Sequence, residues 1–240
     1  PPNGGRVNLG AYGSTLEASL SPTGGGTNFY VNDDETEYDY FCSTGGLPWP
    51  LHTGTSANSP LDAIEAVFNH HSLSSGDTIY IDTGRFELST PIVPPISGTE
   101  GNPVSFAGSP RGTILDANGN ISAGFSLDEI DHITIGGLII ANAAENGLYG
   151  YDSDYLRFSR NLVVGSLLDG VYLDNAAAPV LLNNRITNNS GSGFYGKDIL
   201  ESLTVQGNLV ANNAGYGITI DDGENFDISG NTIEGNTDEG

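Results

Sequence analysis

Residues 147–169 read GLYGYDSDYLRFSRNLVVGSLLD, and residues 170–192, which follow directly, read GVYLDNAAAPVLLNNRITNNSGS. The two segments have the same length, and each has Tyr at its third position and Asn at its fifteenth. The glycine that opens them recurs every 23 or 24 residues, as Gly124, Gly147, Gly170, Gly193, Gly217 and Gly240. Self-similarity at such a period is typical of folds that stack one repeat on the next.

Apolar residues keep fixed places in every repeat. One column is β-branched throughout: Ile140, Val163, Ile186, Val210 and Ile233. Apolar residues two apart, in short runs between Gly, Asn and Asp, indicate strands with one face inward. Since one segment cannot bury that face alone, the coils must stack. Coils of about 23 residues with three short strands, stacked about 4.8 Å apart, predict an all-β parallel β-helix. A leucine-rich repeat has a similar period, but its Leu-x-x-Leu-x-Leu pattern and helical side are missing.

Polar residues also form columns. The first is Leu138, Asn161, Asn184, Asn208 and Asn231, and the second, five residues later, is Ser166, Asn189, Asn213 and Asn236. Asn tolerates the left-handed backbone of tight turns, and stacked amides can hydrogen-bond along a column. We interpret the second column as turn scaffolding, with a binding site as the alternative.

A short helix is predicted before the coils. Residues 59–68 open with Ser59 and Pro60, and place Leu61, Ile64, Val67 and Phe68 on one helical face. An alternating strand follows at 76–82. Such a helix can cover the open end of the first coil, whose strand edges would otherwise invite association.

These stretches carry a family resemblance. Together with residues 75–81, Gly84-Arg85-Phe86 and residues 97–106, the helix resembles secreted right-handed parallel β-helix proteins related to pectate lyases. The resemblance covers roughly residues 28–240 and implies a right-handed β-helix with a capping helix. Because that family contains lyases, hydrolases, epimerases and proteins without known catalysis, it implies no single activity.

Three parts of the chain are expected. Residues 1–22, with the strand-like segment 4–13, resemble the closing segment of a β-helix unit and are predicted to belong to, or pack on, a preceding unit. Residues 23–58 are predicted to be an irregular lead-in. Residues 59–240 are predicted to form the capping helix and the β-helix, continuing beyond residue 240.

The charge balance restricts the partners. Seven basic and 30 acidic residues give a formal charge of −23, which disfavours nucleic acid and anionic membranes and favours cations. No apolar run is long enough for a membrane span. The one cysteine, Cys42, is expected to be a lone loop or partly buried thiol. With the resemblance, this acidity predicts an extracellular or cell-surface location.

Carboxylates follow each repeat glycine by four or five residues. We place Asp128, Asp152, Asp174, Asp198, Asp221 and Asp222 in one column along an edge of the helix, where like charges repel unless they are bridged. Ca²⁺, which prefers carboxylate and carbonyl oxygens, is the predicted metal. The alternative is a solvated acidic face in turns that favour Asp. The acidic loop 32–39 is a second, weaker calcium candidate; a flexible excursion is the preferred interpretation.

Tyr149, Tyr172 and Tyr195 fill equivalent positions and alternate with inward apolar residues, which predicts an outward column of rings. The column is interpreted as a glycan contact or as a rung of stacked rings that stabilises the sheet. A polyuronide lyase needs a cation and a base, and a hydrolase needs converging carboxylates. Neither set is evident, since the basic residues of the repeats form no cluster. The four histidines are scattered.

These patterns predict a structural or adhesive section of a large extracellular tandem β-helix surface or filament protein. It would associate end to end with adjacent units of the same protein and touch polysaccharide. Nucleic-acid binding and membrane insertion are not expected. Whether the chain is an enzyme stays open, with the pattern leaning against it. The alternative is a carbohydrate-active enzyme, such as a calcium-dependent polyuronide lyase, with catalytic coils beyond residue 240.

Overall fold

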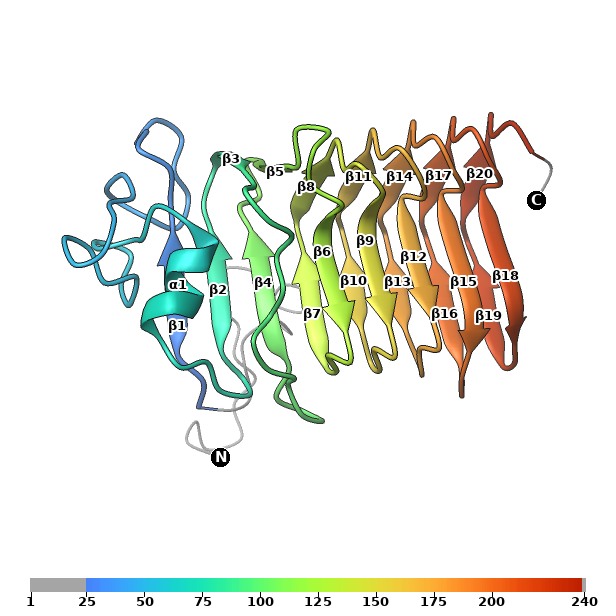
Figure 1. Ribbon diagram of the computed structural model, residues 1–240, viewed down its shortest axis with the longest axis horizontal. Coiled ribbons are helices and arrows are strands. Elements are labelled where there is room, and N and C mark those ends of the chain that lie inside the picture. The colour runs from blue at the N-terminus through green and yellow to red at the C-terminus, as the bar shows by residue number, and fades with distance from the viewer. Residues whose placement is uncertain (1–24, 239–240) are drawn as a thin grey trace.

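The chain forms one long stack of coils in a computed structural model, which describes residues 25–238 (Figure 1). The segment predicted to close a preceding unit, residues 1–22, and Gly240 lie outside the described residues. The strands form three parallel sheets, and almost every strand pairs with its counterparts in the coils before and after it. The predicted parallel β-helix is confirmed.

The largest sheet has eight strands in the order β1-β2-β4-β7-β10-β13-β16-β19. Their bounds are β1 Asn28–Val31, β2 Thr78–Ile81, β4 Val104–Gly108, β7 Ile133–Gly136, β10 Arg157–Ser159, β13 Val180–Leu182, β16 Leu203–Gln206 and β19 Phe226–Ser229. A sheet of seven strands contains β3 Gly84–Glu87, β5 Thr113–Asp116, β8 Leu138–Ala141, β11 Leu162–Val164, β14 Arg185–Thr187, β17 Leu209–Ala211 and β20 Thr232–Glu234.

The third sheet has five strands and carries the candidate site. It contains β6 Ala123–Asp128, β9 Asn146–Tyr151, β12 Val171–Asp174, β15 Phe194–Ile199 and β18 Ile218–Gly223. Leu148 pairs with Val171, and Val171 with Phe194, and all three side chains are fully buried. The inward columns of all three sheets join in one hydrophobic core along the stack.

The repeat glycines are explained by a close approach between two sheets. A Cβ atom built on Gly170 would lie 2.3 Å from Cγ2 of Ile186 and 2.7 Å from the carbonyl oxygen of Gly193. Gly147 and Gly193 face Val163 and Val210 in the same way. The β-branched column therefore fills the space that a side chain at the glycine column would need.

The first Asn column forms a buried hydrogen-bond ladder. Oδ1 of Asn184 accepts from the backbone N–H of Asn161, and Nδ2 of Asn184 donates to Oδ1 of Asn208 (both 3.0 Å). The left-handed backbone conformation was predicted at the Asn column, but it occurs at the residue before each Asn. Arg160 and Asn183 are two examples. The Asn side chain faces inward from the turn. Asn therefore stabilises this position through the hydrogen bonds of its side-chain amide and not through a left-handed backbone.

The second column is a ladder of the same kind. Oδ1 of Asn213 accepts from both the backbone N–H of Asn189 (3.0 Å) and its Nδ2 (2.9 Å), and Asn236 repeats this contact with Asn213. Asn189 and Asn213 are almost fully buried. The interpretation of this column as scaffolding is confirmed.

The predicted helix starts later than expected. Helix α1 runs from Ile64 to His70, and Ile64 and Val67 enter the core at the end of the stack where β1 and β2 lie (Figure 1). The sequence pattern predicts Leu61 on the helix, and this is wrong: Leu61 forms a parallel bridge with Val31, which fixes its backbone in extended form. The lead-in predicted to be irregular, 23–58, also contains a strand, β1, which extends the largest sheet beyond β2.

Candidate functional site

The outer face of the five-stranded sheet brings the predicted tyrosines together; we call it the β6–β18 face. Tyr149, Tyr172 and Tyr195 pair in register on β9, β12 and β15. Their neighbours along each strand, such as Leu148 and Val171, are buried, so the pleat points the rings outward. Ring centroids are 5.7 Å apart for the first pair and 5.5 Å for the second, with interplanar angles of 0° and 5°.

This stacking limits what the rings can bind. A sugar packs its C–H groups on the negative face of an aromatic ring. In the column, each ring turns its faces toward the neighbouring rings. The outer faces are those of Tyr149, whose strand partner is Ser126, and Tyr195, whose strand partner is Thr219. Both partners are small, so the two ends of the column are the places where a sugar ring can stack.

Carboxylates lie beside the phenol groups. The hydroxyl of Tyr172 donates to Oδ2 of Asp174 (3.2 Å), and that of Tyr195 to Oδ2 of Asp221 (3.4 Å). Burial, together with the charge and hydrogen bond of Asp174, raises the pKa of Tyr172 to about 12. Burial and Asp221 likewise raise the pKa of Tyr195. The column therefore stays protonated and can donate hydrogen bonds at physiological pH.

The structure corrects the register predicted for the carboxylates. They occupy two neighbouring columns, because the glycine-to-carboxylate spacing varies by one residue. The first column reads Asp128, Tyr151, Asp174, Lys197 and Asp221. The second, at the left-handed residue that follows, reads Glu129, Asp152, Asn175, Asp198 and Asp222. In the first column, Tyr151 and Lys197 separate the carboxylates, which reduces the repulsion that suggested a calcium bridge. In the second column, only Asn175 separates one pair of carboxylates from the other.

Lys197 is the member of this site that sequence reasoning missed. Its Nζ lies 3.0 Å from Oδ2 of Asp174 and 3.7 Å from Oδ2 of Asp198. The hydrogen bond and charge of Asp174 raise the pKa of Lys197, which holds the ammonium form. The signal was present in the sequence, since Lys197 follows Gly193 by the same four residues that separate Asp174 from Gly170.

Within residues 25–238, no three His, Cys, Asp or Glu side chains converge in a group that could hold a metal ion. The six predicted calcium ligands therefore form no cluster of this kind by themselves. Asp152 instead accepts a hydrogen bond from Nδ2 of Asn175 (3.1 Å). Calcium on these columns stays a prediction.

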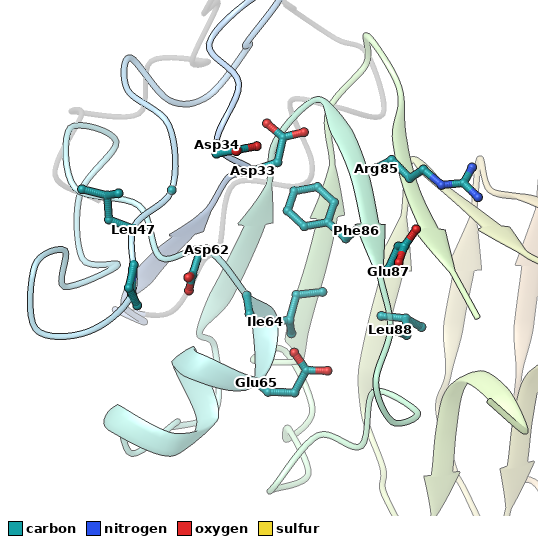
Figure 2. Close-up of a pocket in the computed structure, with 13 residues that line it drawn as sticks. Asp33, Asp34, Leu47, Asp62, Ile64, Glu65, Arg85, Phe86, Glu87 and Leu88 are labelled. Carbon is teal, nitrogen blue, oxygen red and sulfur yellow. The ribbon is translucent and has the colours of Figure 1, made fainter. Parts of the chain in front are cut away.

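A separate acidic cavity lies near α1 (Figure 2). It has a volume of about 460 Å³ and is bounded by the lead-in, the start of α1 and β3. Its lining includes Asp33, Asp34, Asp62, Glu65 and Glu87. Arg85 also lines it, but its guanidinium is directed away from the cavity and pairs with the buried Asp116 (Figure 2).

The histidines and the cysteine have local contacts. His132 stacks on Tyr155 (4.6 Å between centroids), His70 stacks on Trp49 (4.8 Å), and a ring nitrogen of His71 lies 2.6 Å from the carbonyl oxygen of Thr53. Cys42 is buried, and burial raises the pKa of its thiol. The thiol is thus held in the less reactive protonated form.

The three parallel sheets and the Asn ladders together define a parallel β-helix protein. Residues 113–240 match the family model described as "right handed beta helix region", and the chain belongs to that family. The predicted resemblance to pectate-lyase-like β-helices is confirmed. No curated protein matches the chain at a significant level.

Two solved structures share the fold at low identity. The pectate lyase Pel9A superposes with a TM-score of 0.59 and 14% identity, over 81% of this chain and 57% of the lyase. A rhamnogalacturonan lyase gives a TM-score of 0.53 and 14% identity, over 88% of this chain and 62% of the other. The chain thus corresponds to less than two thirds of either enzyme. Among the described residues, no helix has the length and apolar character needed to cross a membrane.

Proposed function

We propose that the chain is a β-helix scaffold with a structural or adhesive role in an extracellular surface or filament protein, and that its β6–β18 face contacts carbohydrate. The observation that carries this proposal is the continuity of the ladders. Two buried Asn columns and one outer Tyr column run through successive coils in register. Such columns stiffen the later coils, from β8 to β20, and a load-bearing or surface-displaying protein needs a stiff stack.

The charges of the β6–β18 face favour a particular kind of glycan. Asp174 and Asp221 flank the tyrosines, and Lys197 is the basic side chain of their column. This excess of negative charge repels polyuronides unless cations screen or bridge them. A neutral polysaccharide, stacked on Tyr195 and accepting hydrogen bonds from the phenols, is the better match.

Affinity electrophoresis in gels containing a neutral galactan or polygalacturonate tests the contact. The neutral glycan is expected to retard the protein, and polygalacturonate to do so only with calcium. Tyr195→Ala is expected to lose most of the retardation. Tyr216→Ala removes a ring that is 44% exposed but outside the stack, and should keep it. Equal retardation of all three proteins, or none, would contradict carbohydrate contact at this face.

The structural role has its own test. Electron microscopy of the native protein, with and without a calcium chelator, is expected to show end-to-end assemblies, which the predicted contact between adjacent units requires. Loss of order on chelation would support calcium stabilisation. Discrete particles indifferent to the chelator would contradict both the assembly and its dependence on calcium.

Lys197 favours a second candidate function, a carbohydrate-active enzyme. A lyase acting on polyuronides needs a positive charge near the uronate carboxylate and a base for the α-proton. Lys197, between Asp174 and Asp198, supplies the positive charge, but its raised pKa makes it a poor base. An assay for unsaturated products, read by ultraviolet absorbance, tests this: activity that disappears in Lys197→Gln would support the enzyme and displace the scaffold proposal.

A further inference from the structure

The lead-in loop, residues 32–44, makes hydrogen bonds to the coils beneath it. The carboxylate of Asp82, which is fully buried, accepts hydrogen bonds from the backbone N–H groups of Tyr40, Phe41 and Cys42. From the turn before β5, Nη1 of Arg111 donates to the carbonyl oxygens of Tyr38 (3.1 Å) and Asp39 (2.7 Å). The second half of the loop therefore has a backbone fixed by hydrogen bonds to the coils.

Oxygen atoms converge inside this loop. Asn32 is fully buried, and its Nδ2 lies 2.8 Å from Oδ2 of Asp39, 2.9 Å from the carbonyl oxygen of Thr44 and 3.4 Å from that of Glu35. One amide nitrogen has two hydrogens and cannot serve three acceptors equally. The loop thus directs more acceptors toward Asn32 than its donors can satisfy.

Three more oxygens of the same residues have no hydrogen-bond partner. They are Oδ1 of Asn32, Oδ1 of Asp39 and Oγ1 of Thr44, and all three are buried. A buried polar atom without a partner is costly, and native proteins rarely keep three of them together. A group that accepts electron pairs from oxygen would satisfy them all.

The loop is rich in negative charge, since the carboxylates of Asp82 and Asp33 lie near that of Asp39. The nearby cation, Arg111, donates to backbone carbonyls of the loop.

We infer that the lead-in loop binds a divalent cation of the Ca²⁺ type. Ca²⁺ takes six to eight oxygen ligands, with carboxylate, amide and backbone carbonyl oxygens among its usual donors. The loop offers both oxygens of Asp39, the carbonyls of Glu35 and Thr44, and the Thr44 hydroxyl. Asn32 adds Oδ1 once its amide is rotated, so that Oδ1 replaces Nδ2 among these oxygens. This site has one carboxylate and neutral donors, lies apart from the carboxylate columns of the β6–β18 face and does not depend on the proposed function.

Such an ion would join the two ends of the loop. Asn32 directly follows β1, and Thr44 lies twelve residues later, near the returning chain. The two residues after Asn32, Asp33 and Asp34, line the acidic cavity beside α1 (Figure 2). The ion would therefore fix one wall of that cavity.

Terbium luminescence tests the site on the complete chain. Tb³⁺ replaces Ca²⁺ at oxygen sites and is excited through nearby tyrosines. Tyr38 and Tyr40, which flank Asp39, can absorb the excitation light and transfer its energy to Tb³⁺. Emission that saturates with Tb³⁺ and is displaced by Ca²⁺ is expected. Thr44→Val, which removes one ligand and one unpartnered hydroxyl, is expected to weaken Ca²⁺ binding about tenfold while the protein stays folded.

A second variant should have opposite effects on calcium affinity and on the melting temperature in chelator. Asn32→Asp adds a carboxylate of the same shape next to Asp39. If a cation binds there, Ca²⁺ affinity should rise at least tenfold, because affinity increases with ligand charge. In chelator, the same variant should melt below the wild type, because two buried carboxylates then repel each other. Without a cation site, Asn32→Asp would melt lower by the same amount in calcium and in chelator, and the inference would be wrong.

Asp221→Asn serves as the matched control on the β6–β18 face. It removes one carboxylate far from the loop, and should leave the Tb³⁺ emission and its displacement by Ca²⁺ unchanged. If Asp221→Asn abolishes the emission while Thr44→Val and Asn32→Asp keep it, the ion binds the carboxylate columns and the lead-in site is excluded. Absence of any saturable emission or calcium-dependent melting in the wild type would overturn the inference as well.

Discussion

The coils from β7 onward and the lead-in loop solve the same problem differently. Both bury polar side chains next to the core. In the coils, each buried Asn finds its partner in the equivalent residue one coil away, as Asn184 does with Asn161 and Asn208. In the loop, the residue equivalent to Asn32 in the next coil is Asp82 and not a second Asn. Asn32 instead donates to Asp39 and to the carbonyl oxygen of Thr44, while three oxygens of these residues stay unpaired.

This difference shows what repetition contributes to a β-helix. A repeated Asn brings both a donor and an acceptor at the same height, so each new coil satisfies the one before it. A segment without repeats must close its own hydrogen bonds or bind something that closes them. Changing single positions in the two regions can break or sharpen this contrast.

The largest effect is expected where the repeat is tightest. Gly170→Ala would place a methyl group 2.3 Å from Ile186 and 2.7 Å from the backbone of Gly193. Because the backbone contact cannot relax by a rotamer change, we expect a loss of roughly 3 kcal/mol in the free energy of unfolding, measured in urea. Gly25→Ala, where nothing lies within 4 Å, is the control and should change little. Equal effects would contradict close packing at the glycine column.

Removing a ladder amide should have the next largest effect. Asn184→Ala leaves the backbone N–H of Asn161 and the carbonyl of Phe158 without their side-chain partner. The expected cost is about 2 kcal/mol, since both groups are buried. Gln206→Ala, which loses one exposed contact to Asp227, should change the free energy of unfolding by less than about 0.5 kcal/mol. Similar values for the two variants would mean that the ladder does not stabilise the stack.

Period and polarity sufficed to predict much of this fold. The columns that contain Gly170, Ile186 and Asn184 are visible in the sequence. In the structure they form the close approach of two sheets, part of the hydrophobic core and the hydrogen-bond ladder. In the segment before the repeats, the sequence predicted the structure less accurately. Leu61 matched a helical face but pairs with Val31, because a long-range strand contact outweighed a local pattern.

The site was predicted less well for a similar reason. Tyr172 and its neighbours share one position in the repeat, so their stacking could be read from spacing. The carboxylates shift by one residue between coils, and an alternation of one residue decides which column a side chain joins. Lys197 occupies a position in the carboxylate column, so a pattern defined by Asp and Glu alone does not include it. The oxygens around Asn32 come from residues with no periodic signal, so their convergence requires the structure.

A smaller and stabilising effect is expected at Ser166, where the second ladder is incomplete. The Oγ of Ser166 is buried without a partner, whereas Asn189 and Asn213 bond along the column. Ser166→Asn should extend the ladder by one rung and raise the free energy of unfolding by about 1 kcal/mol. The reverse exchange, Asn189→Ser, should lower it. A loss of stability in Ser166→Asn would show that this coil lacks the space that the later coils provide.

The smallest effect at neutral pH is expected on the outer face, where repetition aligns charges as well as partners. Tyr172→Phe should change the free energy of unfolding at pH 7 by less than about 0.5 kcal/mol, because the phenol is half-exposed. The pKa of Tyr172 is raised by the fold from 10.0 to about 12, so the folded state favours the protonated phenol. Its stabilising contribution is complete below pH about 10 and falls as the pH rises toward about 12. The difference in tyrosinate absorbance between wild type and Tyr172→Phe should therefore be centred near pH 12. A centre near pH 10 would mean that burial and Asp174 do not raise the pKa of this phenol in solution.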